Sequence, residues 1–323
     1  MTARGRRTLF GLVLAGLVLW VAGATLGAFS SGGGSASAAA GSVGNAPLLE
    51  IGKAHPAEAV PSLTGNKPIF ILCLGSDARP GEPLEGERTD SIHILAINPA
   101  KKRASLVGFP RDSWVNIPGH GMDKINAALT YGGPALTTKV IEDLTGIHMD
   151  YYAITGFGGM ETMINGVHGL TIDVPTDMHD PYSKADFNAG VQHLNGHDVL
   201  AFSRDRHSLP NGDFGRSENQ GLVFISTLEQ FRKEFAKDPS ILLSYVSSGM
   251  QNLQTDLPLS EVISLAFTAT SINPKNVSNA VVPAHVGMQG AESVVFIDSS
   301  AKALYNDLKN DGILQKTYKT PTL

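Results

Sequence analysis

Six of the eleven arginines in this chain stand where predicted strands and helices end, in short segments rich in glycine, aspartate or proline. They are Arg79, Arg88, Arg111, Arg204, Arg206 and Arg216. Arginine carries a planar, permanently charged guanidinium that can bind phosphate or carboxylate through two parallel hydrogen bonds, whereas lysine is a hydrated point charge. Any one of the six could instead form a structural ion pair with a nearby aspartate. Taken together, they predict a pocket for phosphate or carboxylate.

The spacing of three of these arginines adds geometry to the predicted pocket. Arg204 and Arg206 are two residues apart, so their side chains would share one face of an extended segment. Arg216 and Gln220 are four residues apart on a predicted helix that begins after Asp213, so they would share a face near its first turns. The N-terminus of a helix also favours phosphate, because its N–H groups are free and its dipole is positive there.

Two aspartates flank the first two predicted strands. Asp77 follows the strand predicted at 69–74, and Asp90 directly precedes the strand predicted at 91–97, so both carboxylates should lie at one edge of the sheet. Magnesium prefers oxygen ligands and commonly uses one or two carboxylates together with substrate phosphates. Asp77 and Asp90 are therefore the predicted Mg²⁺ ligands. The competing interpretation is that Asp77 caps a turn and Asp90 pairs with Arg88.

Hydrophobic runs and turn residues divide most of the chain into strands and helices. Strands are predicted at 69–74, 91–97, 104–109, 151–155, 170–174 and 277–282. Helices are predicted at 123–131, 134–146, 157–164, 195–202, 216–236, 242–250, 259–269 and 299–308. Strands mixed with helices throughout predict an α/β domain, with a central mixed β-sheet flanked by helices in αβα layers. Residues 66–313 show no break in composition, so one domain is expected there, followed by a loose C-terminal tail at 314–323.

The N-terminal segment predicts one transmembrane helix. Residues 9–29 contain no charged side chain, and a run of about 20 apolar residues matches the roughly 30 Å hydrocarbon core of a bilayer. Arginines in the tail 1–8 predict that this tail stays in the cytoplasm, so the rest of the chain would be extracytoplasmic. Residues 30–65 are rich in glycine, serine and alanine, which is typical of a flexible linker. The alternative is a cleaved signal peptide, because small residues at 35–40 offer a cleavage site.

Charge and cysteine content exclude two classes of site. The formal net charge is −5, whereas proteins that bind nucleic acid through its phosphates usually carry a basic surplus, so no nucleic-acid partner is expected. The single cysteine, Cys73, lies within an apolar run and is expected in the core. One cysteine can form neither an intramolecular disulfide nor a cysteine metal cluster.

Six short motifs follow one another along the chain. They are Gly75-Ser76-Asp77-Ala78-Arg79, Glu87-Arg88-Thr89-Asp90-Ser91, Phe109-Pro110-Arg111-Asp112, Asp123-Lys124-Ile125-Asn126-Ala127-Ala128, Ser203-Arg204-Asp205-Arg206, and Gly212-Asp213-Phe214-Gly215-Arg216 followed by Gln220. With a membrane anchor in front, this series resembles the LytR-CpsA-Psr family of cell-wall ligases over about residues 68–313. One departure is Asn219, which stands where many members carry an arginine, so the pocket holds less charge.

The resemblance implies a phosphotransferase-type reaction in cell-wall assembly. A glycopolymer would move from a polyprenyl-pyrophosphate carrier to the muramic-acid 6-hydroxyl of peptidoglycan, at the cell membrane. The resemblance also implies Mg²⁺ at Asp77 and Asp90, and an apolar tunnel for the lipid tail. It implies pyrophosphate binding by Arg79, Arg88, Arg111, Arg204, Arg206, Arg216 and Gln220. The residues expected to act in catalysis are Arg88, Arg111 and Arg206.

Two other functions stay open at the level of sequence. Water could replace the sugar hydroxyl in the same site, which would make the protein a pyrophosphatase of polyprenyl-pyrophosphate-linked substrates. The protein could also be a non-catalytic, membrane-anchored regulator of envelope processes. For a transferase, Asp90 and Asp112 are both candidates for the proton acceptor, and teichoic acid, capsule and arabinogalactan are all possible polymers.

Overall fold

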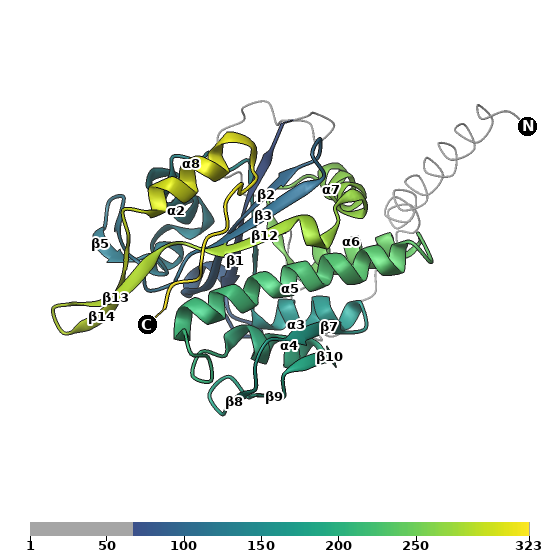
Figure 1. Cartoon of the computed structure of the whole chain (residues 1–323), viewed down its shortest axis with the longest axis horizontal. Helices are drawn as coiled ribbons and strands as arrows, with labels where there is room; N and C mark the ends of the chain where they lie inside the picture. The colour runs from purple at the N-terminus through teal and green to yellow at the C-terminus, as the bar shows by residue number, and fades with distance from the viewer. Residues whose placement is uncertain (1–66, 323) are drawn as a thin grey trace, which may run out of the picture. The chain divides into compact units, whose positions relative to one another are not determined.

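A six-stranded mixed sheet forms the centre of the protein in a computed structural model that describes residues 67–322 (Figure 1). Across the sheet the strands are ordered β11, β6, β1, β2, β3 and β12. In chain order their bounds are β1 Ile69–Ser76, β2 Thr89–Asn98, β3 Arg103–Gly108, β6 Tyr151–Thr155, β11 Gln254–Thr255 and β12 Val277–Val281. β2 runs antiparallel to β1 and β3, whereas β6 is parallel to β1 and β12 is parallel to β3. The predicted mixed sheet is confirmed.

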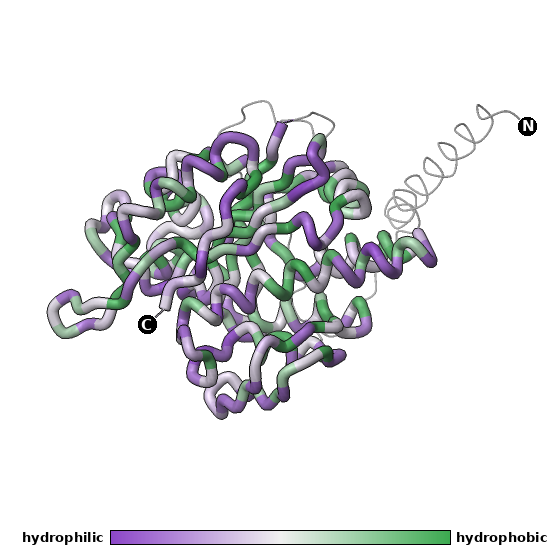
Figure 2. The backbone as a smooth tube through the Cα atoms, in the orientation of Figure 1, coloured by the Kyte–Doolittle hydropathy of each residue, from purple (hydrophilic) through white to green (hydrophobic). Residues whose placement is uncertain are grey.

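Both faces of this sheet are hydrophobic, as the pattern of β1 shows. Side chains alternate between the two faces along a strand. Phe70, Leu72 and Leu74 belong to the hydrophobic cluster on one face, whereas Ile69 and Ile71 belong to the cluster on the other. A sheet that is apolar on both faces needs helices on both sides. Figure 2 shows the band of hydrophobic residues that runs through the sheet.

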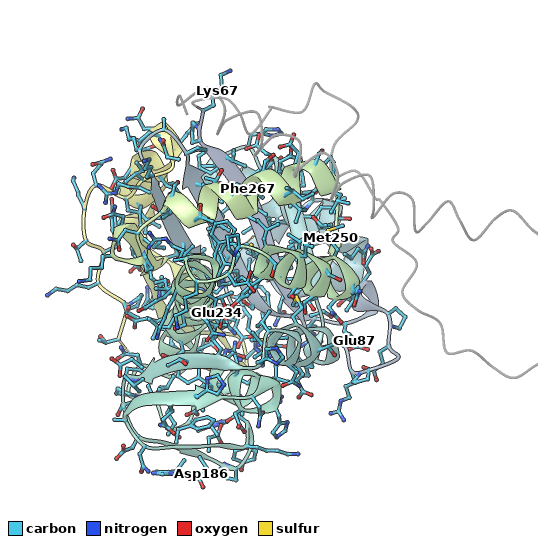
Figure 3. All side chains as sticks on the ribbon, turned by 90° about the vertical axis from the view of Figure 1, so that its right-hand side faces the viewer. Lys67, Glu87, Asp186, Glu234, Met250 and Phe267 are labelled. Carbon is cyan, nitrogen blue, oxygen red and sulfur yellow. The ribbon has the colours of Figure 1, made fainter. Side chains whose placement is uncertain are left out.

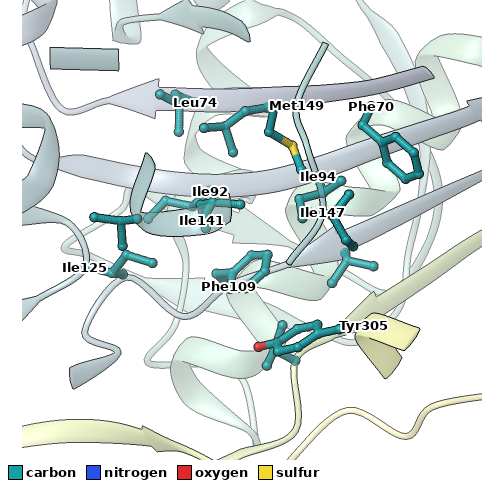
Figure 4. Packing of buried hydrophobic residues seen from close by; sticks show 14 of the residues in the cluster. Phe70, Leu74, Ile92, Ile94, Phe109, Ile125, Ile141, Ile147, Met149 and Tyr305 are labelled. Carbon is teal, nitrogen blue, oxygen red and sulfur yellow. The ribbon is translucent and has the colours of Figure 1, made fainter. Parts of the chain in front are cut away.

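Helices α2 (Ala127–Thr145) and α8 (Ala301–Asp311) cover the first face. Ile141 of α2 and Leu308 of α8 are fully buried in that cluster, and Figure 4 shows how Ile141 packs among its neighbours. α2 is kinked where two glycines precede a proline, and Gly133 has a φ of 65°, which glycine adopts without strain. The break that the sequence predicted at this point is confirmed.

Helices α5 (Gly212–Phe235) and α7 (Leu259–Ser271) pack against the opposite face, and α6 (Ile241–Asn252) lies beside them. Leu228 of α5 and Val262 of α7 contact the hydrophobic cluster there. α7 contains no fully buried residue, so its apolar side chains are only partly covered. Helices on both faces give the expected αβα layers. The start predicted for α5 at residue 216 is one turn late.

A second, smaller hydrophobic cluster lies below the sheet in the view of Figure 1. Its elements are α3 (Phe157–Gly166), β7 (Leu170–Val174), β8 (Met178–Asp180), β9 (Ala185–Phe187), β10 (Gly190–Leu194) and α4 (Gly196–Arg204). β7 pairs with β10, and β8 pairs with β9. Ile172 and Phe202 are fully buried between the strands and the helices. This cluster supports the connection from α4 to α5, which carries Arg206.

Two further hairpins complete the described chain. They consist of β4 (Trp114–Ile117) with β5 (Gly121–Lys124), and β13 (Ala284–Gln289) with β14 (Glu292–Ile297). Short 3-10 helices lie at Leu84–Gly86 and Pro274–Asn276. The helix predicted at 123–131 begins instead at Ala127, because residues 121–124 form β5. That prediction was wrong at its start because a four-residue strand carries too little periodicity to be recognised.

The segment after Ile313 is docked and not loose as far as Tyr318, so the predicted loose tail is wrong there. Leu314 is 3% exposed, and its N–H donates to Oγ of Ser105 over 3.0 Å. The hydroxyl of Tyr318 donates to Oδ2 of Asp307 over 3.1 Å. These contacts link the segment to β3 and α8.

The predicted basic tail 1–8, transmembrane helix 9–29 and linker 30–65 lie outside the described residues. Between residues 67 and 322, none of the helices combines the length and the apolar character needed to cross a bilayer. The described residues all belong to one compact unit.

We expect Leu314→Ala to lower the free energy of unfolding by about 2–5 kcal/mol, because it leaves a cavity in the core. Urea denaturation followed by circular dichroism measures the change. Lys316→Ala, which shortens an exposed side chain, is the matched control and should change stability by less than about 0.5 kcal/mol. Equal stability of the two variants would contradict the docking of this segment.

Candidate functional site

The antiparallel order of β1, β2 and β3 brings three chain segments to one edge of the sheet. β1 and β3 end at this edge and β2 begins there. Asp77 follows β1, Asp90 lies at the start of β2, and Arg111 follows β3. The backbone N–H of Asp77 donates to the backbone oxygen of Arg88 over 3.0 Å, which fixes the first segment against the second. Residues that are far apart in sequence therefore meet at this edge.

Arg111 and Asp90 form a partly buried ion pair at this edge, in which Nη1 of Arg111 donates to Oδ1 of Asp90. Burial by itself would lower the pKa of the Arg111 guanidinium. The carboxylates of Asp90, Asp112 and Asp213 outweigh burial and raise that pKa. Arg111 therefore has acidic neighbours from β2, from its own loop and from α5.

Arg216 lies at the start of α5 and is only 5% exposed. Its Nη2 lies 2.6 Å from Oδ1 of Asp213, one turn earlier on the helix. Burial lowers the pKa of the Arg216 guanidinium, while Asp213 and Asp90 act against burial and the charges of Arg111 and Arg206 act with it. Arginine stays protonated in proteins. Burial is the largest cause of the lowered pKa, so the Arg216 guanidinium lies in a poorly solvated place where an anion would stabilise its charge.

Gln220 links the edge of the sheet to helix α4. Its Nε2 donates to the backbone oxygen of Ser203 over 3.1 Å and to that of Asp90 over 3.3 Å. The side chain is 8% exposed. Gln220 thus joins the start of β2, the end of α4 and the first turns of α5 through one buried amide.

Several buried polar atoms at this edge have no hydrogen-bond partner among the described residues. They include Nε of Arg111, Nε of Arg216, both carboxylate oxygens of Asp213 and Oδ1 of Asp77. The contact between Arg216 and Asp213 is therefore an ion pair without good hydrogen-bond geometry. Buried polar groups are rarely left unpaired in native proteins unless they serve an ion, water or ligand. Free guanidinium N–H groups fit an anion, and a free carboxylate oxygen fits a cation.

Asp77 and Asp90 lie close enough for their charges to interact. Burial raises the pKa of Asp77, and the negative charge of Asp90 raises it further, while the hydrogen bond at the Arg88 backbone and the charge of Arg111 act in the other direction. Two carboxylates that repel each other would both be stabilised by a cation between them. The pair therefore fits a divalent metal through Asp77 and the oxygen of Asp90 that does not bind Arg111.

Arg79 and Arg88 are not brought into this cluster, and both are exposed. Within residues 67–322 the guanidinium of Arg79 has no ion-pair partner. The side chain of Arg88 lies near Tyr131 of α2, whose hydroxyl donates to Asp123. The alternative pairing of Asp90 with Arg88 is wrong, because Asp90 pairs with Arg111.

The segment of Arg204 and Arg206 is not extended throughout, because it begins at the end of a helix, so the condition for a shared face is not met. Arg204 is the last residue of α4, and its guanidinium lies over the ring of Phe157, with Cζ 4.4 Å from the ring centroid. Arg206 lies beyond the end of the helix, and its charge acts on Arg216. The cluster proper is formed by Arg111, Arg206 and Arg216.

His93 is a buried residue that the sequence analysis missed. It is 0% exposed and lies on β2, three residues after Asp90. Its Nε2 lies 3.1 Å from the backbone oxygen of Ser217, and its Nδ1 lies 3.1 Å from Oγ of Ser91. A carbonyl only accepts hydrogen bonds, so Nε2 carries the proton and Nδ1 accepts from Ser91. Ser91 and His93 alternate along β2, and this polar pattern was the available signal.

The neutral His93 ring links β2 to α5 through its hydrogen bond to Ser217, the residue after Arg216. Burial lowers the pKa of His93 to about 4, although the hydrogen bond to Ser217 acts in the other direction. Ser217 follows Arg216, so the same contact positions the backbone that carries that arginine. His93 therefore acts on the geometry of the site and not on its charge.

The sequence profile of the LytR_cpsA_psr family matches residues 42–310, which is most of the chain. The chain belongs to the LytR-CpsA-Psr family. The resemblance seen in the six motifs is thereby confirmed.

Several relatives of this LytR-CpsA-Psr protein have been named. It is 36% identical over 203 residues to the probable cell wall biosynthesis protein LcpB of Corynebacterium glutamicum, covering 59% of this chain and 47% of LcpB. It is 32% identical over 219 residues to the polyisoprenyl-teichoic acid–peptidoglycan teichoic acid transferase TagT of Bacillus subtilis, covering 64% and 66%. It is 33% identical over 223 residues to the regulatory protein MsrR of Staphylococcus aureus, covering 67% and 64%. The matches thus span about half of LcpB and just under two thirds of the other two.

Solved structures of the family share the fold. The crystal structure of B. subtilis TagV superposes with a TM-score of 0.67 at 25% identity, covering 79% of this chain and 100% of that chain. The structure of TagT bound to LI-WTA superposes with a TM-score of 0.63 at 26% identity, covering 81% and 98%.

Because the pKa of His93 is about 4 when folded, against 6.5 for an ordinary histidine, the unfolded chain binds a proton between these values that the folded chain does not. The stabilisation by His93 is therefore complete above pH 6.5 and declines as the pH falls toward 4. We expect the free energy of unfolding to fall by on the order of 3 kcal/mol as the pH is lowered over this range. Urea denaturation of wild type and His93→Gln at several pH values tests this. The same pH dependence in both proteins would show that His93 is not the titrating group.

Proposed function

We propose that this chain is a membrane-anchored transferase that moves a glycopolymer from a polyprenyl-pyrophosphate carrier to peptidoglycan. The observation that supports this most strongly is the meeting of Arg111, Arg206 and Arg216 at one edge of the sheet, where buried N–H groups lack partners among the described residues. Such a site fits a diphosphate. The name of TagT describes transfer of a polyisoprenyl-linked polymer to peptidoglycan, and membership in its family supports the same reaction class here.

In the proposed reaction the acceptor hydroxyl oxygen attacks the phosphorus that carries the glycan. The bond from this phosphorus to the bridging oxygen breaks, and polyprenyl phosphate leaves with the negative charge that develops on that oxygen. Arg111, Arg206 and Arg216 would stabilise this charge, Arg111 and Arg216 from positions that their ion pairs fix before the reaction. Such stabilisation is strongest where water is scarce. Arg79, Arg88 and Arg204 would contact the substrate at the rim of the site.

The proton of the acceptor hydroxyl must pass to a base, for which Asp90 and Asp112 are the candidates. Asp90 forms an ion pair with Arg111 through Oδ1, so its other carboxylate oxygen is the one that would accept the proton. Asp112 accepts from Nδ2 of Asn126 over 3.4 Å and lies 3.8 Å from Nζ of Lys124. Asp112 is therefore held near the end of β5, and an acceptor hydroxyl for which it is the base would have to approach there.

Asp77 and Asp90 would hold Mg²⁺. The unpartnered Oδ1 of Asp77 and the mutual repulsion of the two carboxylates support this assignment. Over residues 67–322 there is no cluster of three or more histidine, cysteine or acidic side chains suited to a metal. The other ligands would therefore be phosphate oxygens and water, as is common for magnesium. When bound, the ion would neutralise charge on the phosphates.

The lipid tail would lie along α5, between that helix and α7. Phe224 is 36% exposed and contacts the ring of His93, so it lies beside the charged site. Further along α5, Leu228 is partly buried, and Phe235 contacts Phe267 of α7, which is 38% exposed. Figure 3 shows Phe267 on α7 above α6. Each methylene that a tail buries here would contribute about 0.8 kcal/mol.

The place of the reaction follows from the N-terminal sequence. The apolar run at 9–29, with the arginines before it, would anchor the chain in the membrane and leave the catalytic domain extracytoplasmic. The linker at 30–65 would allow that domain to reach both carrier lipid and wall.

Two alternatives are separated by one assay. A pyrophosphatase would transfer the glycan phosphate to water and would need no peptidoglycan. A non-catalytic regulator, the function that the name of MsrR describes, would leave the donor unchanged. Lipid-linked donor is incubated with the full-length protein, with and without peptidoglycan, and products are identified by mass spectrometry. Donor loss that does not depend on peptidoglycan would favour the pyrophosphatase.

In this assay we expect Arg111→Ala to lower transfer at least 100-fold, because it removes a donor to the developing charge. Lys139→Ala, which removes a cation from an exposed ion pair with Asp143, is the control and should transfer normally. Circular dichroism should show both variants folded. Wild-type turnover by Arg111→Ala would contradict the assignment of Arg111 to the active site.

We also expect the response of the protein to Mg²⁺ to require the carboxylate of Asp77. With geranylgeranyl pyrophosphate present, Mg²⁺ should raise the melting temperature of the wild-type protein, and chelator should reverse the rise. Asp77→Asn keeps the shape of the side chain but loses its charge, so its melting temperature should not respond to Mg²⁺. An unchanged response in this variant, or transfer that continues in chelator, would remove Asp77 as a ligand.

A further inference from the structure

Among the large hydrophobic residues of the described chain, Tyr182 is the most exposed, at 79%. It lies in the loop between β8 and β9, and its ring contacts that of His207, with centroids 4.9 Å apart and planes tilted by 48°. An isolated exposed aromatic is unremarkable by itself. What distinguishes Tyr182 is the structure that holds it in place.

A buried carboxylate fixes the loop on which Tyr182 stands. Asp180 is 2% exposed, and it accepts hydrogen bonds from the N–H of Tyr182 over 2.9 Å and from the N–H of Ser183 over 3.3 Å. Nδ1 of His207 donates to the same carboxylate over 3.1 Å. Burial opposes ionisation of Asp180, but these hydrogen bonds outweigh burial and lower its pKa to about 2. One carboxylate thus positions both rings.

A second buried carboxylate, that of Asp205, holds the backbone of His207. Asp205 is 0% exposed and accepts from the N–H of His207 over 3.0 Å and from the N–H of Ser208 over 3.2 Å. Oγ of Ser208 in turn accepts from the N–H of His179 on β8 over 2.8 Å. The loop that carries His207 is therefore tied to the hairpin that carries Tyr182.

The chain places His207 next to the charged site, and the ring contact with His207 brings Tyr182 along with it. His207 directly follows Arg206, whose charge acts on Arg216. In Figure 1 the β8–β9 hairpin lies beside the connection from α4 to α5, and Figure 3 shows Asp186 of this hairpin at the end of the domain opposite to Lys67. Because Arg206 and His207 are consecutive residues, a group attached to a phosphate at the arginines would come within reach of the His207 ring.

We propose that Tyr182 and His207 form a stacking surface for a pyranose ring of the glycan that is handled at the arginine site. This rests on the proposed function. A pyranose presents an apolar face of C–H groups that packs on an aromatic ring, and its hydroxyls need polar partners at the edge. The Tyr182 hydroxyl and Nε2 of His207, for which no partner is found within residues 67–322, supply such partners. Rings fixed in advance lose little entropy on binding.

The sugar could belong to the donor or to the acceptor, and two probes separate these sources. The first is geranylgeranyl pyrophosphate that carries one N-acetylglucosamine, compared with sugar-free geranylgeranyl pyrophosphate. The second is a soluble glycan oligomer of peptidoglycan without lipid. Binding to the full-length protein in detergent micelles is measured by isothermal titration calorimetry.

We expect Tyr182→Ala to weaken binding of one sugar probe by roughly three- to tenfold, while sugar-free geranylgeranyl pyrophosphate binds as before. Tyr182→Phe keeps the ring and should stay within about twofold of wild type. Val191→Ala, at a 71% exposed apolar residue on β10, is the control for general surface loss. A loss confined to the lipid-linked probe assigns the surface to the donor, and a loss confined to the oligomer assigns it to the acceptor.

Three results would overturn the stacking surface: wild-type binding of both sugar probes by Tyr182→Ala, an equal loss in Tyr182→Phe, or an equal loss for the sugar-free probe. The proposed function fails by a different result, namely no binding of sugar-free geranylgeranyl pyrophosphate to the wild-type protein. The oligomer still tests the stacking surface in that case.

Discussion

The site depends on keeping like charges together in a partly buried place. Arg216 is almost fully buried, and Arg111 and Arg206 both add positive potential to it. Removing guanidinium groups from water is costly unless counter-charges lie close. Asp90 and Asp213 supply those charges without using every N–H group. The folded protein thus holds guanidinium groups whose N–H donors are only partly used by the neighbouring carboxylates, and a diphosphate would bind to the remaining donors.

The sheet topology makes this arrangement possible. Because β2 is antiparallel to both of its neighbours, the start of one strand and the ends of two others share an edge. α5 then crosses to this edge and contributes Arg216 and Gln220 from its first turns. His93 joins the strand and the helix through Ser217, so the position of the charged groups depends on a neutral buried contact. The apolar side chains further along α5 lead away from the same edge, so one helix serves both a phosphate and a lipid tail in the account proposed above.

Much of this was predictable from local sequence, and the reasons for the errors are physical. The strand at 69–74 and the helix break before Pro134 rest on strong local signals, an apolar run and a pair of glycines. The hairpins are too short for their periodicity to be read, and the segment after Ile313 is ordered by contacts with β3 and α8 that no local pattern records. The arginines were recognised by type and place. Which of them converge was not predictable, since Arg204 lies over Phe157 while the charge of Arg206 acts on Arg216.

In the proposed function Arg111, Arg206 and Arg216 bind one diphosphate beside Asp77 and Asp90. A crystal structure of the protein with geranylgeranyl pyrophosphate and Mg²⁺ measures this most directly. We expect phosphate oxygens within hydrogen-bond distance of Arg111 and Arg216, with the metal on Asp77. Diphosphate bound elsewhere, with the Arg111–Asp90 and Arg216–Asp213 pairs undisturbed and no ligand on their free N–H groups, would contradict it.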